Sequence, residues 1–526
     1  MGRAVFVALV RAPFSYKYNR TDVREEVILC QAAAYLEAVA VHHKVFDFHL
    51  QRDLSIRDIC SSSPSHIVIA VRETGDNVQY ALRLAHALIR LGLDNVILYG
   101  QTARLSDHPL RPTGALVVPH SEAALAACIG ISATGPHFRN SLVQSPYGLN
   151  FDLAPWQRRR FRASIETSRG CPYPCRFCFI NAGENHELRW QVQEPDVVMA
   201  SLERYRSAGV KHAVFHDSEF VGGGRRDRSG RQALVDRLAA AVPFISFKIY
   251  NRADSLLSFG DVERLKRAGL VSVFMGVESF VQTDLDDMKK NMSVGKIFEA
   301  INILLDYGIY LDLSFILFHR STTTTSLRTN LNHIIKLYSS SRARLLGMPH
   351  FTFSFESPWR SARGHDLSGR TYVGWDVKMK APAVAGVVFD PTLEPLMEIF
   401  RLLAYEWSRK VVDLNLARDA ASADDRKAIE AWYAGLALFC AQTMLGMLDR
   451  FDEGLLTLDT LPNARDELFC KISKSYEILP QGLRQLATYS DHAAGLSYRE
   501  GSELLEMDEY WLGQIPDFPQ TLSSGA

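Results

Sequence analysis

Apolar and polar positions along the first 140 residues follow a pattern that predicts strands separated by helices. Short apolar runs rich in β-branched residues recur about every 30 residues, and stretches with Leu and Ala at helical spacing lie between them. This alternation is typical of a parallel sheet with helices on both faces, which is a doubly wound, Rossmann-like fold. The expected strands are 4–10, 44–50, 66–71, 95–100 and 115–118, and the expected helices are 25–41, 77–91 and 121–129.

A second series of strand–helix units begins at residue 163 and continues to residue 318. A repeat of this kind indicates a partial or full TIM-type barrel, whose active site lies at the carboxyl ends of the strands. The expected strands are 163–167, 213–216, 245–250, 271–276 and 310–318, and the expected helices are 195–208, 231–241, 260–268 and 294–307.

Two further regions complete the expected α/β organisation. One is a connector, with a turn at 146–148 and a basic run at 156–162 that either neutralises an anion or forms a solvated face. The other is the C-terminal part, where the pattern becomes helical, with amphipathic stretches at 393–411, 424–442 and 443–451. The expected domains are 1–140, 141–162 (the connector), 163–375 and 376–526.

Composition and charge place the chain among soluble globular proteins of two or three domains. It has 526 residues, of which 47% are apolar and 22% charged, and 59 basic residues balance 59 acidic ones. A net charge of zero argues against a general nucleic-acid or membrane-surface binder. No uninterrupted apolar run reaches the length of about 18 residues that a membrane span needs. The apolar stretch near the N-terminus is broken by Arg11 and Pro13, which favours a first strand over a signal peptide.

The run 168–179 contains three of the eight cysteines, with the spacing C-x3-C-x2-C. Three thiolates on one short loop, Cys171, Cys175 and Cys178, can hold three irons of a [4Fe–4S] cluster and leave the fourth iron open to a small molecule. A zinc site needs a fourth ligand, for which only His186 lies near. A redox pair formed by the second and third cysteines leaves the first without a role. The pattern therefore favours the cluster.

The remaining five cysteines show no paired spacing, and we interpret them as reduced, buried thiols of a cytoplasmic protein. An oxygen-sensitive cluster suits the same reducing compartment. These five cysteines are Cys30, Cys60, Cys128, Cys440 and Cys470.

Polar side chains follow two strands of the expected barrel at the point where each strand ends. Asp217 and Glu219 follow the strand 213–216, and Glu278 and Ser279 follow the strand 271–276. Each pair taken alone could cap a helix. Because the carboxyl ends of barrel strands meet at one face, the two pairs together are candidates for cofactor binding beside the cysteine loop.

Taken together, these motifs resemble the radical SAM superfamily, as it occurs in enzymes with an N-terminal cobalamin-binding-type domain. The resemblance runs from about residue 163 to residue 318 and includes the cysteine run, Gly276-Val277-Glu278-Ser279 and Met288-Lys289-Lys290-Asn291. It implies that the three cysteines bind a [4Fe–4S] cluster and that neighbouring residues bind S-adenosylmethionine (SAM). The implied cofactor-binding residues are Phe177 at the adenine, Glu278 at the ribose with Ser279 beside it, and Asp217 and Glu219 at the amino group of SAM or at the substrate.

The resemblance also implies the chemistry. A reduced cluster donates an electron to SAM, which splits into methionine and a 5′-deoxyadenosyl radical that removes hydrogen from an unactivated carbon. We expect a cobalamin-dependent methyltransferase that acts on an unactivated carbon of a small specialised metabolite. Two alternatives stay open. One is a radical SAM enzyme that dehydrates, deoxygenates, epimerises or rearranges a small molecule without methyl transfer, and the other is a non-catalytic iron–sulfur protein that relays electrons.

The cobalamin assignment depends on the N-terminal alternation and not on a motif. An Asp-x-His-x-x-Gly loop, which places a histidine under cobalt in many cobalamin proteins, does not occur in residues 1–140. Its absence is compatible both with a cobalamin that lacks this ligand and with a domain that has lost the cofactor. Candidate residues around the ligand lie at strand ends and are Arg11, Tyr16, Arg72, Glu73 and Thr74.

Substrate and partners follow from what surrounds the cysteine run. No second set of paired cysteines follows Cys178, so an auxiliary cluster of the kind used on peptides is not expected and a small-molecule substrate is favoured. The segment 350–363 alternates aromatic and polar residues, and it either lines the substrate pocket or forms an ordinary half-buried strand. We also expect an external electron donor such as flavodoxin or ferredoxin, and no nucleic-acid or membrane partner.

Overall fold

The computed structural model describes most of the chain. The described residues are 5–12, 23–51, 54–71, 75–100, 113–139, 141–178, 190–222, 225–241, 245–319, 321–347, 349–353, 372–376, 381–387, 390–400, 403 and 423–477.

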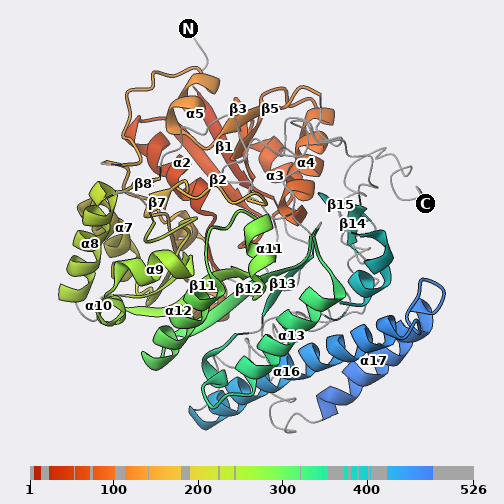
Figure 1. Cartoon of the computed structure of the whole chain (residues 1–526). Coiled ribbons are helices and arrows are strands. Elements are labelled where there is room, and N and C mark those ends of the chain that lie inside the picture. Colours follow the sequence, from red (N-terminus) through yellow and green to blue (C-terminus); the bar gives the residue numbers. More distant parts are fainter. Residues whose placement is uncertain are drawn as a thin grey trace.

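The N-terminal region folds into a five-stranded sheet in which every neighbouring pair of strands is parallel. Its strand order is β2-β1-β3-β4-β5, the flavodoxin-like order, so the carboxyl ends of β1 and β3 flank the switch point where such sheets bind ligands. Figure 1 shows this sheet in red and orange. The strands are β1 (Phe6–Arg11), β2 (His42–Asp47), β3 (His66–Val71), β4 (Val96–Gly100) and β5 (Leu116–Pro119).

Helices cover both faces of this sheet, which confirms the expected doubly wound fold. Val7 and Leu9 of β1 belong to a core cluster that includes residues of α2 and α5. Ala8 and Val10, which point to the opposite face, belong to a second cluster with α3 and α4. The four helices are α2 (Val27–Ala38), α3 (Ile56–Ser61), α4 (Gly75–Arg90) and α5 (Glu122–Cys128).

Two elements of this region differ from the sequence prediction. The strand expected at 44–50 ends at Asp47, because the Asp47 carboxylate accepts the backbone amides of His49 (2.9 Å) and Leu50 (3.0 Å) and turns the chain. The helix α3 was not predicted, because its six residues are too few to show helical periodicity.

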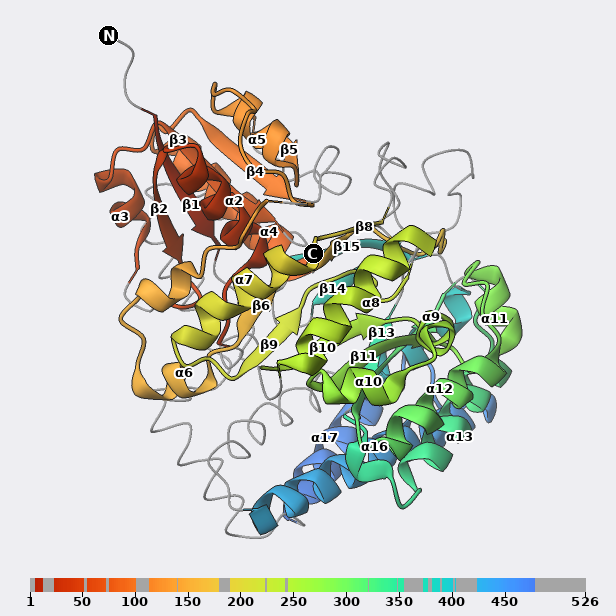
Figure 2. The ribbon, with the colours of Figure 1, turned by 90° about the vertical axis from the view of Figure 1, so that its left-hand side faces the viewer.

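The second sheet has six parallel strands whose order follows the chain, from β6 at one edge to β13 at the other. No pairing between β13 and β6 occurs in the described part of the chain, so the sheet is a partial barrel (Figure 2). The strands are β6 (Ala163–Ile165), β9 (His212–Phe215), β10 (Ser246–Asn251), β11 (Leu270–Glu278), β12 (Tyr310–Phe318) and β13 (His350–Phe353).

Helices lie along one side of this sheet, and the strand residues that face them are buried. On β10, for example, Phe247 and Ile249 are fully buried, whereas Lys248 and Tyr250, which alternate with them along the strand, are only partly covered. The core cluster that begins under α2 continues without interruption into this second layer. The helices are α7 (Pro195–Ser207), α8 (Arg225–Ala240), α9 (Ala253–Phe259), α10 (Val262–Arg267), α11 (Gln282–Asp287), α12 (Val294–Asp306) and α13 (Thr324–Tyr338).

The connector between the sheets contains a 3-10 turn, η2 (Tyr147–Asn150), and the short helix α6 (Pro155–Arg160). The expected basic run therefore forms most of α6, and the guanidinium of Arg158 donates to the carbonyl of Leu153 at 3.1 Å. Two short antiparallel strands, β7 (Ser168–Arg169) and β8 (Gln191–Val192), follow β6 and lead into and out of the cysteine-rich segment.

The C-terminal part is mainly helical, as expected, but its division differs from the prediction. The helices expected at 424–442 and 443–451 form one continuous helix, α16 (Ala423–Asp452), followed by α17 (Leu461–Glu477). A two-stranded antiparallel ribbon, β14 (Tyr372–Asp376) and β15 (Ala381–Val387), lies across the domain boundary expected at residue 375.

Within the described part of the chain, one helix is long and apolar enough to cross a membrane, judged by length and composition alone. It is the stretch Glu430–Asp452 of α16, which packs against α13 of the barrel (Figure 1). Arg328 of α13 pairs with Asp449 at 2.5 Å and with Asp452 at 2.7 Å. Such packing is also what the core helix of a water-soluble protein shows.

A buried carboxyl group joins α2, the connector and α7. Glu25 is 1% exposed, and its carboxyl oxygens accept the Gly148 amide at 2.5 Å and the Tyr205 hydroxyl at 2.6 Å. Burial raises the pKa of Glu25 to about 8, and the two hydrogen bonds only partly oppose this. Glu25 therefore carries a proton in the folded protein near neutral pH.

We expect Glu25 to make the protein less stable as the pH rises from about 6 to 8. Its pKa is about 8 when folded and 4.5 in the reference state. Between these values the folded state binds more protons, so stability falls with pH by about 2 kcal/mol over this window. Glu25→Gln should flatten the dependence of the melting temperature on pH. Glu203→Gln, at a partly exposed position on α7, is the control, and an unchanged slope in Glu25→Gln would contradict the assignment.

Candidate active site at the carboxyl edge of the second sheet

The cysteine loop leaves the carboxyl end of β6, the first strand of the partial barrel, through β7. Cys175 is buried, Cys171 and Cys178 are half-buried, and none of them forms a disulfide. The Cys178 amide donates to the Cys175 carbonyl at 3.2 Å, which makes a tight turn between these two residues. No three Cys, His, Asp or Glu side chains converge to hold a metal in the described residues. The donor chemistry of the loop, three thiols within eight residues, is what fits an iron–sulfur cluster.

The Asp217 carboxylate holds the root of this loop. It accepts the backbone amides of Thr167 at 2.6 Å and Ser168 at 2.8 Å, and it pairs with the fully buried Arg231 at 3.3 Å. Burial raises the pKa of Asp217, while Arg231 and the amides act in the opposite direction. Asp217 thus reaches the loop from the end of β9, as the sequence predicts, and its oxygens contact protein groups there.

Glu219 lies beside the loop and joins it to the end of β10. Its carboxylate accepts the Arg252 amide at 3.0 Å and the Ser255 hydroxyl at 2.5 Å. Burial raises the pKa of Glu219 to about 7. A Cβ on Gly222 would lie 2.5 Å from Cγ of Glu219 and 3.2 Å from the Pro172 ring, so a glycine is needed where this segment passes the loop.

Glu278 stands at the end of β11 in a left-handed conformation, with φ of 67°. A register shift between Gly276 and Glu278 accompanies this turn. The carboxylate meets the ammonium of Lys290 at 2.7 Å, and this ammonium lies 5.6 Å from the ring centre of Phe177 on the cysteine loop. The structure therefore brings the two residues expected at the ribose and the adenine close to the same lysine. A side chain at Gly276 would collide with this ion pair, at 2.6 Å from Glu278.

Ser279 lies next to Glu278 but makes its contacts elsewhere. Its hydroxyl donates to Asp284 of α11 at 2.7 Å and accepts from the Asn330 amide of α13 at 3.0 Å. These bonds fix the start of α11 against α13. The structure does not bring Ser279 together with the cysteine loop.

Arg252, at the end of β10, was missed by the sequence analysis. One guanidinium nitrogen donates to the sulfur of Cys175 at 3.3 Å, and the plane of the group lies 4.1 Å from the Tyr173 ring. The signal that could have revealed it is the same as for Asp217 and Glu278, a polar residue directly after an expected strand.

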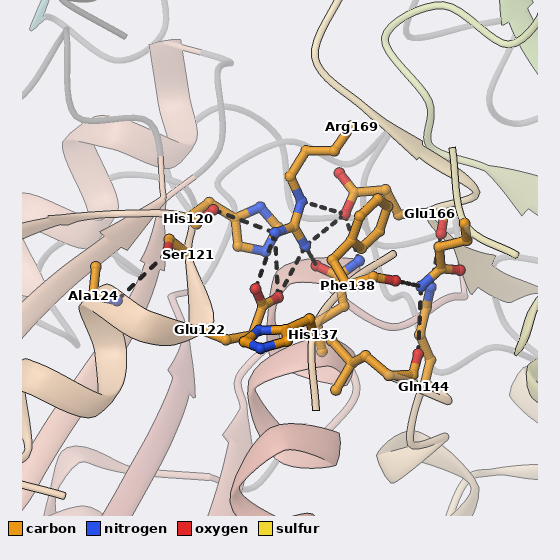
Figure 3. A network of polar contacts seen from close by, with 12 residues as sticks. His120, Ser121, Glu122, Ala124, His137, Phe138, Gln144, Glu166 and Arg169 are labelled. Carbon is orange, nitrogen blue, oxygen red and sulfur yellow. Dashed lines mark hydrogen bonds and ion pairs between the residues drawn. The ribbon is translucent and has the colours of Figure 1, made fainter. Parts of the chain in front are cut away.

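The two sheets meet around Arg169, two residues before the first cysteine (Figure 3). Its guanidinium pairs with Glu122 of α5 at 3.2 Å and with Glu166 at 3.0 Å, and it donates to Gln31 of α2 at 2.9 Å. The Phe138 ring lies 4.1 Å below it. Because Glu122 follows β5, the carboxyl edge of the N-terminal sheet faces the root of the cysteine loop.

The remaining sequence candidates have different outcomes. Arg11 is buried, pairs with Asp47 at 3.3 Å and donates to the Arg24 carbonyl at 2.7 Å, so it stabilises the end of β1. Of the segment 350–363, only the first four residues are described, and His350 lies 5.2 Å from the Phe274 ring. Tyr16, Arg72, Glu73, Thr74 and His186 lie outside the described residues.

Residues 165–323 match the family described as the Radical SAM superfamily. The match begins at the end of β6 and ends just before α13, so it contains the cysteine loop and the ends of β9, β10, β11 and β12. These residues therefore form a radical SAM domain, which confirms the resemblance drawn from the cysteine run.

Three characterised proteins show sequence similarity to part of the chain. The hopanoid C-3 methylase of Methylococcus capsulatus is 28% identical over 31% of this chain and 32% of its own length. The hopanoid C-2 methylase of Rhodopseudomonas palustris is 30% identical over 28% of each chain. The 4′-phospho-dehydrooxetanocin synthase of Priestia megaterium is 30% identical over 30% of this chain and 24% of its own length. The chain thus matches no more than about a third of each relative.

The whole architecture has a counterpart among solved structures. The cobalamin-dependent S-adenosylmethionine radical enzyme OxsB, with aqua-cobalamin bound, superposes with a TM-score of 0.64. The superposition covers 98% of this chain and 85% of OxsB, at 15% sequence identity. At this identity the likeness concerns the fold. It confirms the expected α/β architecture of an N-terminal parallel sheet, a radical SAM barrel and C-terminal helices.

We expect Glu278→Gln to weaken SAM binding about tenfold to a hundredfold, because a charged acceptor beside the cysteine loop is lost. The measurement is equilibrium binding of SAM to the protein with its cluster rebuilt, together with its iron content. The exposed Glu299→Gln on α12 is the matched control. Unchanged SAM affinity in Glu278→Gln would remove Glu278 from the SAM site.

Proposed function

We propose that this protein is a radical SAM enzyme that methylates an unactivated carbon of a small molecule with the help of cobalamin. In this proposal Cys171, Cys175 and Cys178 ligate a [4Fe–4S] cluster. The observation that carries the proposal is the three-cysteine loop at the carboxyl edge of a radical SAM domain, facing the carboxyl edge of a second parallel sheet. Both edges are the ligand-binding edges of their folds.

The surroundings of the loop suit such a cluster. Thiolates that bind iron carry negative charge. Burial raises the pKa of the Cys175 thiol, and two nearby cations, Lys290 and Arg252, oppose this shift by favouring the thiolate. When bound, the cluster and SAM supply the one-electron chemistry that opens the carbon–sulfur bond of SAM. The protein itself holds and orients these groups.

The residues around the loop have separate tasks in this proposal. Asp217 holds the loop root through two amides, which keeps the three thiols in place. Phe177 and Glu278, which both lie near Lys290, can accept the adenine and the ribose of SAM. Glu219, whose pKa is raised to about 7 by burial, offers an acceptor for an amino group.

Cobalamin is assigned to the N-terminal sheet. The support is the switch point between β1 and β3, the helices on both faces and the fold shared with an enzyme that was solved with cobalamin. Two relatives named as methylases support methyl transfer as the reaction.

The proposal extends to partners and compartment. We infer a small-molecule substrate, an external one-electron donor such as flavodoxin or ferredoxin, and a reducing, cytoplasmic location. The last of these is supported by the cysteines in the described residues, none of which forms a disulfide.

A second candidate is radical chemistry on a small molecule without methyl transfer. It is favoured by one observation, the 30% identity to a 4′-phospho-dehydrooxetanocin synthase, which is not named as a methylase. The two candidates share the cluster and SAM, and they differ in the products formed from SAM.

Cys171→Ala, Cys175→Ala and Cys178→Ala should each abolish the cluster and all SAM cleavage, because a [4Fe–4S] site with two thiolates is no longer held. Iron and sulfide content after anaerobic reconstitution, followed by assay of 5′-deoxyadenosine, measures both effects. Cys470→Ala, an exposed cysteine on α17, should keep full iron content. Full iron content and activity in any of the three loop variants would overturn the proposal.

We expect the protein to retain about one cobalamin per chain after incubation with hydroxocobalamin and desalting, measured by its visible spectrum. With SAM carrying a deuterated methyl group and a reductant, the methyltransferase should form S-adenosylhomocysteine and a labelled small molecule from a metabolite extract. No retained cobalamin, together with an intact cluster that yields only methionine and 5′-deoxyadenosine, would favour the second candidate.

A further inference from the structure

Arg252 is held in place on every side by groups that leave one guanidinium nitrogen directed at a thiol. Its Nε and one Nη donate to the Asp254 carboxylate at 3.0 and 3.1 Å, and the same Nη donates to the Lys290 carbonyl at 2.6 Å. The other Nη donates to the Cys175 sulfur at 3.3 Å. These hydrogen bonds fix the orientation of the planar guanidinium, and in this orientation the second Nη points at the Cys175 sulfur.

The neighbours of Arg252 restrict its movement further. The guanidinium stacks on Tyr173 of the cysteine loop at 4.1 Å, and its backbone amide donates to Glu219 at 3.0 Å. The residue is 6% exposed. A hydrogen bond from a charged donor is stronger in such a buried setting than in water, because little solvent screens it.

We propose that Arg252 raises the reduction potential of the cluster held by the cysteine loop, through its N–H···S hydrogen bond to Cys175. Hydrogen bonds to cluster sulfurs and the net charge nearby are the means by which a protein tunes such a potential. One-electron reduction adds negative charge to the cluster, and a positive donor stabilises that charge more in the reduced state than in the oxidised one. Arg252 is thus a positioning and tuning residue for the first electron transfer, and this rests on the proposed function.

A second arginine on the same loop provides a matched control. Arg176 follows Cys175 in the sequence, but its guanidinium pairs with Asp287 at 3.4 Å. Its backbone amide donates to the Met288 carbonyl at 2.9 Å. Loss of Arg176 removes a positive charge from the loop without removing the hydrogen bond from Arg252 to Cys175.

The experiment is a redox titration of the reconstituted full-length protein without SAM, followed by electron paramagnetic resonance of the reduced cluster. At the potential where the wild-type cluster is half reduced, Arg252→Gln should lower the ratio of reduced to oxidised cluster about tenfold, or about 59 mV for one electron. Arg252→Lys keeps the positive charge but lacks the planar guanidinium. Its reduction potential should lie between those of the wild type and Arg252→Gln. Arg176→Gln should stay near the wild type. Iron content should be equal in all four proteins.

Each outcome has one meaning. A wild-type potential in Arg252→Gln, with full iron content, would overturn the inference. An equal shift in Arg176→Gln would assign the effect to charge and also overturn it. If Arg252→Gln loses its iron, the redox titration of Arg252→Lys tests the inference instead, and a wild-type potential in that variant would overturn it. A wild-type protein that binds no cluster would instead refute the proposed function.

Discussion

The arrangement of the molecule depends on the buried ion pairs of Arg169 with Glu122 and Glu166 (Figure 3). A buried arginine strongly destabilises the fold when its carboxylate partners are missing. The elements that carry Arg169, Glu122 and Glu166 therefore have to pack so that the three charges are in contact. Glu122 belongs to the N-terminal sheet, and Arg169 leads into the cysteine loop. The relative position of the two ligand-binding edges is therefore fixed by the same contact that satisfies the charge.

Around the loop, each predicted acidic ligand already has a protein partner. Asp217 holds backbone amides, Glu219 holds an amide and a hydroxyl, and Glu278 holds the Lys290 ammonium. These partners orient the carboxylates without a cofactor present, which lowers the entropy that binding has to overcome. In the proposed function, a cofactor that binds Glu278 would share the carboxylate oxygen with Lys290 or displace the Lys290 ammonium from it. The cations beside Cys175 complete a site in which charge is arranged before the cofactor enters.

Much of this could be predicted from the sequence. The strands of both sheets lie close to their expected positions, because buried parallel strands are continuous apolar runs that stand out against polar loops. The prediction of two separate helices in the place of α16 was wrong. The sequence around Gln442 and Thr443 contains no residue that ends a helix, so one helix continues through it. Ser279 was selected with Glu278 because both follow the same strand and belong to the run Gly276-Val277-Glu278-Ser279, whereas its contacts with Asp284 and Asn330 depend on how α11 and α13 pack.

The sequence by itself determined the order of strands and helices and the donor chemistry of the cysteine loop, because apolar period and ligand spacing are local properties of the chain. Only the tertiary structure decided which charges meet. Glu122 lies 47 residues from Arg169, and Cys175 lies 77 residues from Arg252. The first contact joins the two sheets, and the second joins two separate segments of the barrel. Their distance and direction follow from strand order, register and packing, which no local pattern encodes.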